Sequence, residues 1–290
     1  MIGVDIGGTK IKIALVEGAR IVAEESVDTP VGQPPSVLLD LVASTVNGLS
    51  PKPRTIGVAI PGEVNRSGRC YRLPNIPGFE GIPIATELEK RTGARVAVEN
   101  DATTAALAEA LYGHGRDHES FLTVTLGTGV GGGVVLLRRL IRGVHGFAGE
   151  IGHVIVDSSD GARTCGCGNR GCLEAYAGIR GILETFRAAG GAGTDVVAVA
   201  ESARRGEAAG LAAFADLSRV LGIALTSIQN LLDLDAIVFT GGVSGAFDLI
   251  APRLREELRK RRYAEPLSEV LLLRSELGEK AGVVGAAHLG

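Results

Sequence analysis

The sequence contains no tryptophan, and its aromatic side chains are only seven phenylalanines and four tyrosines. It therefore offers no obvious aromatic platform on which a ligand ring would stack. An excess of one charge is also absent, since 30 basic side chains stand against 33 acidic ones and leave a net charge of −3. This balance supplies no electrostatic footprint for a nucleic-acid backbone. A small-molecule ligand is favoured, and no nucleic-acid partner is expected.

Long apolar runs are missing as well. No stretch of about 18 apolar residues suggests a membrane span, and the N-terminal MIGVDIGGTK lacks the basic segment and apolar core of a signal peptide. We therefore expect a cytoplasmic protein with no membrane partner. With 290 residues, 45% of them hydrophobic, the chain is long enough for two ordinary domains.

Glycine is abundant, with 42 residues, and it clusters where predicted strands end. Alternating β-branched residues predict a meander of three strands, after which helical spacing predicts a βαβ unit. The predicted elements are strands 2–7, 10–16 and 21–28, a helix at 36–49 capped by Ser36, a strand at 55–60, a helix at 84–92, a strand at 95–99 and a helix at 101–112. This alternation indicates a sheet covered by helices.

The second half is predicted to repeat this opening, with a strand, a glycine-rich turn and another strand. The elements are strands 120–126 and 133–137, helices 173–188, 195–205 and 207–230, a strand at 235–240, a helix at 246–261, a strand at 268–273 and a helix at 280–288. We predict a small α/β domain at 1–113 and a large α/β domain with the cysteine loop at 114–277. The last helix, within about 278–290, is expected to pack back on the first domain.

Three glycine-rich segments are candidates for phosphate binding. In Asp5-Ile6-Gly7-Gly8-Thr9-Lys10 the glycines expose backbone N–H groups beside a hydroxyl and a cation, although an ordinary hairpin turn would also explain this segment. Residues 127–133 hold five glycines in seven positions, so the backbone there must approach something closely. Gly241 and Gly242 follow an apolar strand, at the place where open α/β sheets bind ligands.

Glu99, Asn100 and Asp101 lie where a predicted strand meets a helix. Helix capping by Asn100 or Asp101 would explain one of these residues. Three polar side chains in succession fit a cluster that binds hydroxyl groups, with one carboxylate acting as a base.

The cysteines predict a metal site. Cys165, Cys167 and Cys172 lie within eight residues of one another, and His153 precedes them. Three thiolates and one imidazole complete a tetrahedral shell for a structural zinc ion, which has no open position to activate water. Four unrelated buried residues are the alternative, whereas Cys70 stands alone and is expected to pack in a core. The zinc would fix the flanking residues Glu150 and Glu174.

The motifs DIGGTK, END, LGTGVGGG, AGEIGH and CGCGNRGCLEAYAG occur in one order along nearly the whole chain. In this the sequence resembles the ROK family of bacterial glucokinases and related sugar kinases, within the actin and hexokinase superfamily. The resemblance implies a two-domain, actin/hexokinase-like (ribonuclease H-like) α/β fold with an interdomain cleft. It also implies ATP-dependent phosphorylation of a hexose in carbohydrate metabolism and glycolysis, with glucose first, Mg²⁺ bound with ATP, and a homodimer or homotetramer.

The same resemblance implies the roles of individual residues, with Asp101 as the general base. Residues expected to bind the sugar are Gly62, Asn75, Asn100, Asp101, Glu150, His153 and Glu174. Residues expected to bind the nucleotide are Asp5, Gly7, Gly8, Thr9, Lys10, Gly127, Thr128, Gly129, Gly241 and Gly242, with Asp5 placing Mg²⁺. The metal ligands would be His153, Cys165, Cys167 and Cys172. One position departs from the family pattern, because Gly178 replaces the usual serine after Ala-Tyr-Ala.

Other activities remain open within the resemblance. Kinases for N-acetylmannosamine, N-acetylglucosamine, fructose and allose share these motifs. Sugar-responsive repressors of the family carry a DNA-binding domain ahead of the kinase-like part, whereas here the first predicted strand follows Met1 directly. ATPases of the chaperone or filament type would share the glycine turns but have no use for the cysteine loop. Polyphosphate-dependent relatives lack that loop, which favours ATP.

Overall fold

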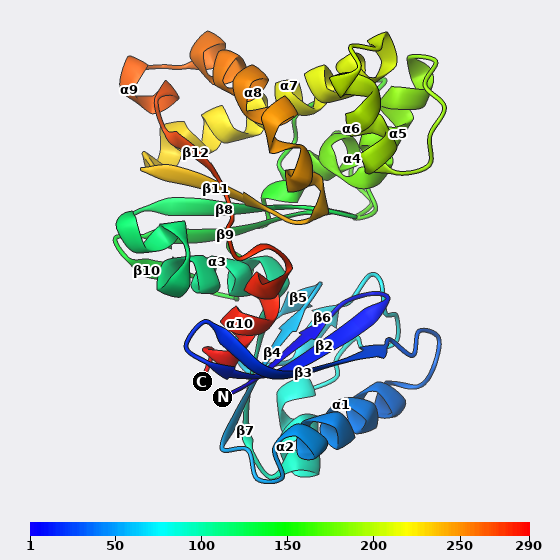
Figure 1. Cartoon of the computed structure of the whole chain (residues 1–290), viewed down its shortest axis with the longest axis vertical. Coiled ribbons are helices and arrows are strands. Elements are labelled where there is room, and N and C mark those ends of the chain that lie inside the picture. Colours follow the sequence, from blue (N-terminus) through cyan, green and yellow to red (C-terminus); the bar gives the residue numbers. More distant parts are fainter. The chain divides into compact units, whose positions relative to one another are not determined.

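The computed structural model describes residues 1–290 and contains two five-stranded sheets (Figure 1). The first has the strand order β3-β2-β1-β4-β7, and the second has the order β10-β9-β8-β11-β12. In each sheet, three strands that follow one another in the chain are joined by two more strands reached through helices. The second half of the chain therefore repeats the order of strands found in the first half, as the sequence predicts.

The elements of the first sheet agree in type with the predictions. Its strands are β1 (Ile2–Ile6), β2 (Lys10–Glu17), β3 (Arg20–Asp28), β4 (Thr55–Ile60) and β7 (Arg95–Asn100), and its helices are α1 (Pro35–Leu49), α2 (Ile84–Thr92) and α3 (Asp101–Tyr112). A short pair, β5 (Glu63–Val64) and β6 (Cys70–Arg72), was not predicted. The predicted cap of α1 was wrong: the helix begins after Pro34 without a side-chain cap, and Pro35 occupies the first turn, where its missing N–H costs nothing.

In the second half, the predicted helix at 173–188 is divided at Gly178. The strands are β8 (Phe121–Leu126), β9 (Val130–Leu136), β10 (Arg139–Ile141), β11 (Ala236–Thr240) and β12 (Leu271–Arg274). The helices are α4 (Glu174–Ala177), α5 (Ile179–Ala188), α6 (Val196–Arg204), α7 (Ala208–Leu232), α8 (Phe247–Arg261), α9 (Glu265–Ser268) and α10 (Ala281–Ala287). Gly178 has an extended backbone and is the N-cap of α5. The helix has no side-chain cap, because glycine lacks the hydroxyl that the usual serine would supply.

The chain forms two compact units. The first comprises residues 1–117, 133–149 and 276–290, and the second comprises 118–132 and 150–275. Residues 133–149 thus cluster with the first unit, whereas the sequence places them in the second domain. The physical reason lies at Gly133, where an added Cβ would lie 2.4 Å from the Cβ of Ala106 and 2.6 Å from the carbonyl oxygen of Ala102. From this glycine onward the chain packs directly on α3.

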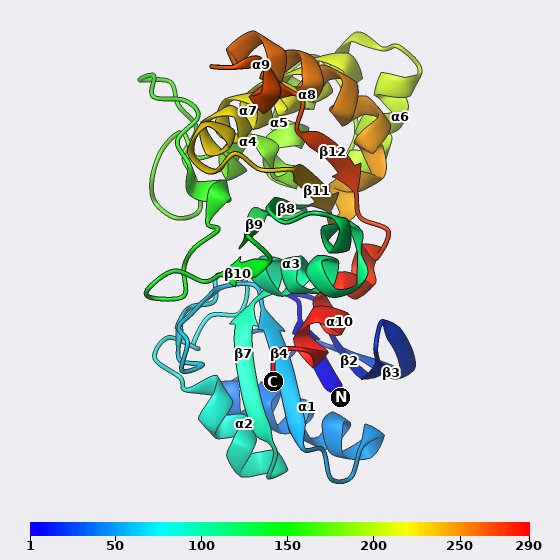
Figure 2. The same ribbon diagram turned by 90° about the vertical axis from the view of Figure 1, so that its left-hand side faces the viewer.

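The first sheet buries both of its faces. Successive residues of β2 point to opposite sides, so Ile13 joins the side chains of α1 and α2 while Ala14 joins those of α3 and α10. Figure 1 shows α1 and α2 together on one side of these strands, and Figure 2 shows both chain termini close to the same sheet. Cys70 is fully buried in the larger of the two apolar clusters.

The helix α10 touches the backbone of the sheet at two glycines. An added Cβ at Gly57 of β4 would lie 1.6 Å from the carbonyl oxygen of Ala286, and one at Gly3 of β1 would lie 2.0 Å from that of Val283. Backbone cannot give way as a flexible side chain does, so only glycine permits this approach.

The helix α7 is long and apolar enough to cross a membrane by length and composition alone, with a mean hydropathy of 1.5 over 18 residues. The helix is not an uninterrupted apolar run, because Asp216 and Arg219 lie within it. Within the fold, 61% of that window is buried, and α7 packs against α5, α6 and α8. This is the behaviour of the central helix of a globular unit.

The glycine contacts of α10 predict a difference between two Gly→Ala substitutions. Gly57→Ala should lower the free energy of unfolding by about 3 kcal/mol, because α10 must move away from the sheet. Gly48→Ala on α1, where an added Cβ meets no atom within 4 Å, should raise it by up to about 1 kcal/mol. Urea unfolding curves measure both, and equal effects would contradict the docking of α10 on Gly57.

Candidate functional site

Several predicted site residues lie at one edge of the first sheet. The strands β1, β4 and β7 run parallel, with Asp5 paired to Ala59 and Ile60 paired to Asn100. Their carboxyl ends therefore meet at the same edge, which is where open α/β sheets bind ligands. Gly7 and Gly8 follow β1, and Gly62 follows β4. Asn100 is the last residue of β7, and Asp101 comes directly after it.

Asn100 is the N-cap of α3. Its side-chain oxygen accepts hydrogen bonds from the backbone N–H groups of Ala102 at 2.9 Å and Thr103 at 3.1 Å. Its amide nitrogen donates to the carbonyl oxygen of Gly62 at 3.2 Å. A primary amide has two N–H donors, so a second one is available for a ligand. The capping role therefore leaves one donor of this side chain for a ligand.

Asp101 is the first residue of α3 and is partly buried. Its Oδ1 accepts the N–H of Ala102 at 2.8 Å. The N-terminus of a helix stabilises a negative charge, because its unpaired N–H groups and the helix dipole are both positive there. The position suits an ionised carboxylate that acts as a base.

The turn between β1 and β2 is braced from β3. The N–H of Gly7 donates to the carbonyl of Lys10 at 2.8 Å, and the hydroxyl of Thr29 donates to the carbonyl of Gly7 at 2.7 Å. Lys10 forms an ion pair with Asp28 at 2.7 Å, but both side chains are exposed, so the pair contributes little to stability. The loop is held by its backbone, and the Lys10 ammonium stays at the surface.

Gly8 lies against Asn75, another predicted sugar ligand. A Cβ added to Gly8 would stand 3.2 Å from the Cβ of Asn75. The structure thus brings a candidate phosphate-binding glycine and a candidate sugar-binding amide into contact within the first unit.

Asp5 lies on β1, opposite Lys12 of β2. An added Cβ at Gly282 of α10 would lie 2.4 Å from its Oδ2, so the carboxylate is enclosed by the helix backbone. Burial raises the pKa of Asp5 to about 6, and the positive charge of Lys12 offsets only part of this rise.

In the second unit, the two remaining glycine segments also share an edge. The strands β8 and β11 are parallel, with Thr125 paired to Thr240, so residues 127–129 and Gly241 with Gly242 follow neighbouring carboxyl ends. Gly241 has a φ of 82°, and an added Cβ would lie 2.3 Å from the carbonyl oxygen of Leu126. Only glycine fits there. At Gly127 and Gly242 an added Cβ meets nothing within 4 Å, which leaves these positions open to a ligand.

Glu174 explains one glycine of the 127–133 segment. Its Oε2 accepts the N–H of Val130 at 3.1 Å, and a Cβ added to Gly129 would lie 2.3 Å from the same oxygen. The close approach predicted for this turn is therefore made, at Gly129, to a carboxylate of the chain itself. Glu174 Oε1 lies 3.6 Å from the Sγ of Cys165, so the carboxylate connects the glycine turn to the cysteine loop.

The predicted metal ligands gather at one point. The donor atoms of His153, Cys165, Cys167 and Cys172 all lie within 4.8 Å of one another. The sulfur atoms of Cys167 and Cys172 are 3.6 Å apart, and Cys165 Sγ is 3.8 Å from His153 Nδ1. Tetrahedral coordination with Zn–S bonds of about 2.3 Å requires sulfur–sulfur separations of about 3.8 Å. The residues present fit such an ion.

The orientation of His153 separates its two nitrogens. Nδ1 faces the thiols, while Nε2 lies 3.9 Å from Oε2 of Glu150. An ion held through Nδ1 would therefore leave Nε2 beside Glu150. Burial raises the pKa of Cys172 to about 12, so a metal ion must displace a proton from this thiol to bind.

A polar network that the sequence did not predict supports the cysteine loop. The hydroxyl of Tyr176 donates to Oδ2 of Asp157 at 2.6 Å and accepts the N–H of Arg163 at 3.0 Å. The guanidinium of Arg163 also lies 4.6 Å from the centre of the Tyr176 ring. The hydrogen bond from Tyr176 holds the pKa of Asp157 at about 2. Tyr176 belongs to a motif that the sequence singled out, but its partners lie in the preceding loop.

The full length of the chain, residues 1–290, matches the model of the ROK family. The chain belongs to the ROK family. It is 34% identical to a glucokinase of Streptomyces coelicolor over 99% of this chain and 96% of that protein, and 32% identical to an N-acetyl-D-glucosamine kinase of Vibrio cholerae over 99% and 98%. The structure of a ROK family glucokinase from Streptomyces griseus, in complex with glucose and AMPPNP, matches with a TM-score of 0.85 at 32% identity, over 100% of this chain and 98% of that one.

These likenesses confirm the predicted fold class. This ROK protein has the α/β fold of the family's hexokinase-like structures, and its two sheets of matching strand order are the two halves of an actin-like fold.

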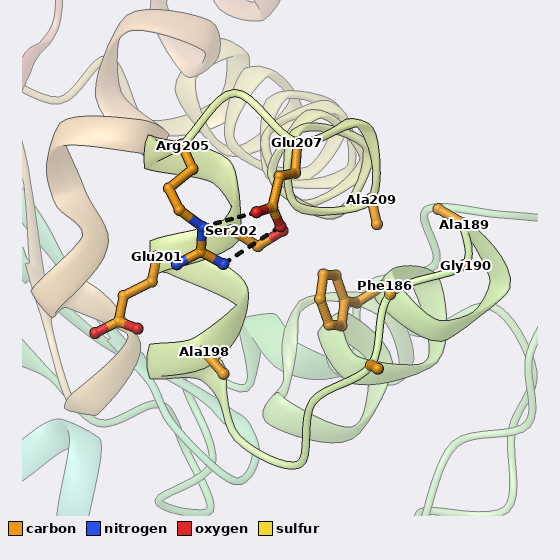
Figure 3. Close-up of a pocket in the computed structure, with 11 residues that line it drawn as sticks. Phe186, Ala189, Gly190, Ala198, Glu201, Ser202, Arg205, Glu207 and Ala209 are labelled. Carbon is orange, nitrogen blue, oxygen red and sulfur yellow. Dashed lines mark hydrogen bonds and ion pairs between the residues drawn. The ribbon is translucent and has the colours of Figure 1, made fainter.

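A hollow of about 440 Å³ in the second unit lies apart from every predicted site residue of this ROK protein (Figure 3). The ring of Phe186 faces it, and Glu207 forms its polar side by accepting hydrogen bonds from Arg205 and Ser202. Because Glu207 is already paired within the chain, the hollow offers a ligand few unpaired polar groups.

The raised pKa of Asp5 predicts a dependence of stability on pH. The folded chain holds this proton more tightly than the unfolded chain, so the stabilisation is complete below about pH 4 and is lost as the pH rises through about 6. Between about pH 4 and pH 7, without divalent cations, the unfolding free energy of the wild type should fall by on the order of 2 kcal/mol relative to Asp5→Asn. Urea unfolding at several pH values measures this difference.

Asp28→Asn serves as the control, because this carboxylate is on the same sheet and its side chain is 84% exposed. The difference in unfolding free energy between Asp28→Asn and the wild type should stay nearly constant over this pH range. If the difference in unfolding free energy between Asp5→Asn and the wild type is also constant, burial does not raise the pKa of Asp5.

Proposed function

We propose that this ROK protein is an ATP-dependent hexose kinase that converts glucose to glucose 6-phosphate. The observation that carries the proposal is the Asp101 carboxylate at the start of α3, beside the Asn100 cap and the carboxyl ends of three parallel strands. Likeness to glucokinases over nearly the whole chain supports the same reaction.

In the proposed reaction, Asp101 accepts the proton of the sugar hydroxyl while the hydroxyl oxygen attacks the γ-phosphorus of ATP. The bond between this phosphorus and the β,γ-bridging oxygen breaks, and ADP leaves. Phosphoryl transfer demands positioning, charge neutralisation and a base rather than a covalent intermediate. The spare N–H of Asn100 would donate to a neighbouring hydroxyl. Other sugar contacts would come from Gly62, Asn75, Glu150, His153 and Glu174.

The nucleotide would be held by the glycine segments that the sequence singled out. Backbone N–H groups at residues 7–10 and 127–129 would bind phosphate oxygens, and the open sides of Gly241 and Gly242 would lie by the nucleoside. Mg²⁺ bound with ATP would neutralise phosphate charge, with Asp5 as the carboxylate that places it. Exclusion of water from the site would matter, because water competes as a phosphoryl acceptor. A cytoplasmic homodimer or homotetramer completes the proposal.

An N-acylhexosamine kinase is the second candidate, supported by the likeness to the N-acetyl-D-glucosamine kinase. Such an enzyme uses the same base and nucleotide site, so the two candidates differ in the sugar pocket. A fructokinase differs in the same way. A sugar-responsive repressor, the remaining candidate, has no need for a base at Asp101.

A coupled assay with ATP and Mg²⁺ against glucose, N-acetylglucosamine, N-acetylmannosamine, fructose and allose tests the proposal. We expect the largest kcat/KM for glucose. Asp101→Ala should lower kcat by about 10³-fold or more while glucose binding changes by less than about tenfold, because a base acts in the transition state.

Asp40→Asn is the matched control, since this exposed carboxylate of α1 pairs only with Arg91 and should leave kcat unchanged. Turnover that survives in Asp101→Ala would refute the assignment of the base. Absence of activity on all five sugars would favour the repressor.

We further propose that His153, Cys165, Cys167 and Cys172 hold one structural zinc ion. The donor separations and the soft ligand set support this. Zinc would clamp Glu174 and Glu150 through Cys165 and His153, which lie beside them.

Elemental analysis should find about one zinc per chain, and Cys165→Ser should lose most of it. Removal of the ion by a chelator should lower the melting temperature by several degrees and weaken glucose binding, because the clamp on the two glutamates is released. Cys70→Ala should keep its zinc, since Cys70 is buried in the apolar core of the first unit. A chelated protein of unchanged melting temperature and sugar affinity would contradict the clamp.

A further inference from the structure

Glu99 is a buried carboxylate directly before the proposed catalytic segment, and its side chain is only 8% exposed. Oε1 accepts the backbone N–H of Asn100 at 3.0 Å. Oε2 accepts the Nε–H of Arg142 at 2.6 Å. One oxygen thus holds the backbone of Asn100, and the other is held by a guanidinium from a distant part of the chain.

The backbone of Asn100 determines where α3 begins. Its N–H is bound to Glu99, and its carbonyl oxygen accepts the hydroxyl proton of Thr104 at 2.7 Å. Because its side chain caps α3, a rotation of Asn100 would move the first turn of the helix and with it Asp101. The Glu99 carboxylate therefore acts on the site through the backbone.

Arg142 is itself fixed on the first unit. It follows β10, and its carbonyl oxygen accepts the N–H of Ala148 at 3.2 Å. Arg66 donates to the next carbonyl, that of Gly143, at 2.7 Å. The loop closed in this way ends immediately before Gly149 and Glu150 in the sequence. Arg142 thus connects the Asn100 segment to the loop that leads to another proposed sugar ligand.

We propose that Arg142 and Glu99 are positioning residues for phosphoryl transfer. The guanidinium orients the Glu99 carboxylate, the carboxylate fixes the backbone of Asn100, and Asp101 is thereby held where it meets the sugar hydroxyl. This inference rests on the proposed role of Asp101 as the base. A short charge-assisted hydrogen bond is directional, and a buried carboxylate without its partner turns to another donor or takes up a proton. A displacement of about 1 Å in a catalytic group costs about a hundredfold in rate.

A matched control is available in the same hollow. Arg142 lines a hollow of about 590 Å³ in the first unit together with Arg66, Arg139 and Glu99. Arg139 is exposed on β10, three residues before Arg142. Arg139→Gln removes a positive charge from this hollow and leaves the bond between Arg142 and Glu99 in place.

The kinetic test compares the kcat and KM of four variants with those of the wild type. Each protein is assayed well below its own melting temperature, and kcat is expressed per folded molecule. Arg142→Met should lower kcat by about tenfold to a hundredfold with KM for glucose changed by less than about threefold. Arg142→Lys should recover part of the loss, and Arg139→Gln should stay within about twofold of the wild type.

The double variant Glu99→Gln/Arg142→Met separates positioning from stability. It leaves no unpaired buried charge, so it should regain melting temperature relative to Arg142→Met. Its kcat should nevertheless stay at least about tenfold low, because the orienting bond is still missing. If both the kcat and the melting temperature of the double variant return to the wild-type values, the pair of Arg142 and Glu99 is merely structural, and the inference is overturned.

Hydrogen exchange supplies a readout that needs no activity. The amide of Asn100 should exchange at least about tenfold faster in Arg142→Met than in the wild type, and at the wild-type rate in Arg139→Gln. Unchanged protection in Arg142→Met overturns the inference, whether or not the wild type phosphorylates a sugar. A wild type that phosphorylates no sugar refutes the proposed function instead, and the exchange rates then decide whether the pair holds Asn100.

Discussion

The hydrogen bonds of Asn100 join three parts of the first unit at one residue. Its side-chain oxygen closes the first turn of α3, its amide nitrogen binds the carbonyl of Gly62, and its backbone N–H is held by Glu99. The end of β7, the start of α3 and the turn after β4 therefore cannot move independently. This arrangement sets the position of the Asp101 carboxylate, so the catalytic role proposed for Asp101 depends on an ordinary helix cap.

The glycines of the chain serve two distinct physical purposes. At Gly57, Gly129 and Gly241, an added Cβ would strike a backbone carbonyl or a fixed carboxylate, so glycine there is required by the fold itself. At Gly127 and Gly242 the space is open, and glycine exposes backbone to solvent or to a ligand. Both purposes occur within a few residues of each other at the edge shared by β8 and β11. Glycine content alone therefore does not distinguish a binding turn from a packing contact.

The cysteine loop, with its candidate metal ligands, is organised by contacts within the protein. Tyr176 holds Asp157 and the backbone of Arg163, and Glu174 joins the loop to the glycine turn at Val130. These contacts place the four donor atoms close together around residues 153–172. Binding of an ion to ligands that are already gathered costs less conformational entropy than gathering them from a flexible loop.

The local pattern of the sequence by itself determined the types of most elements, including the 101–112 helix and the strands whose ends carry the candidate residues, because burial periodicity is a local property. It also identified the Cys₃His group whose donor atoms the structure brings together, since three of its members lie in one short loop. Only the tertiary structure decided that residues 133–149 pack with the first unit and that Arg142 meets Glu99, 43 positions away. Which buried carboxylate faces which guanidinium depends on the packing of β10 and α3 and leaves no periodic trace in the chain.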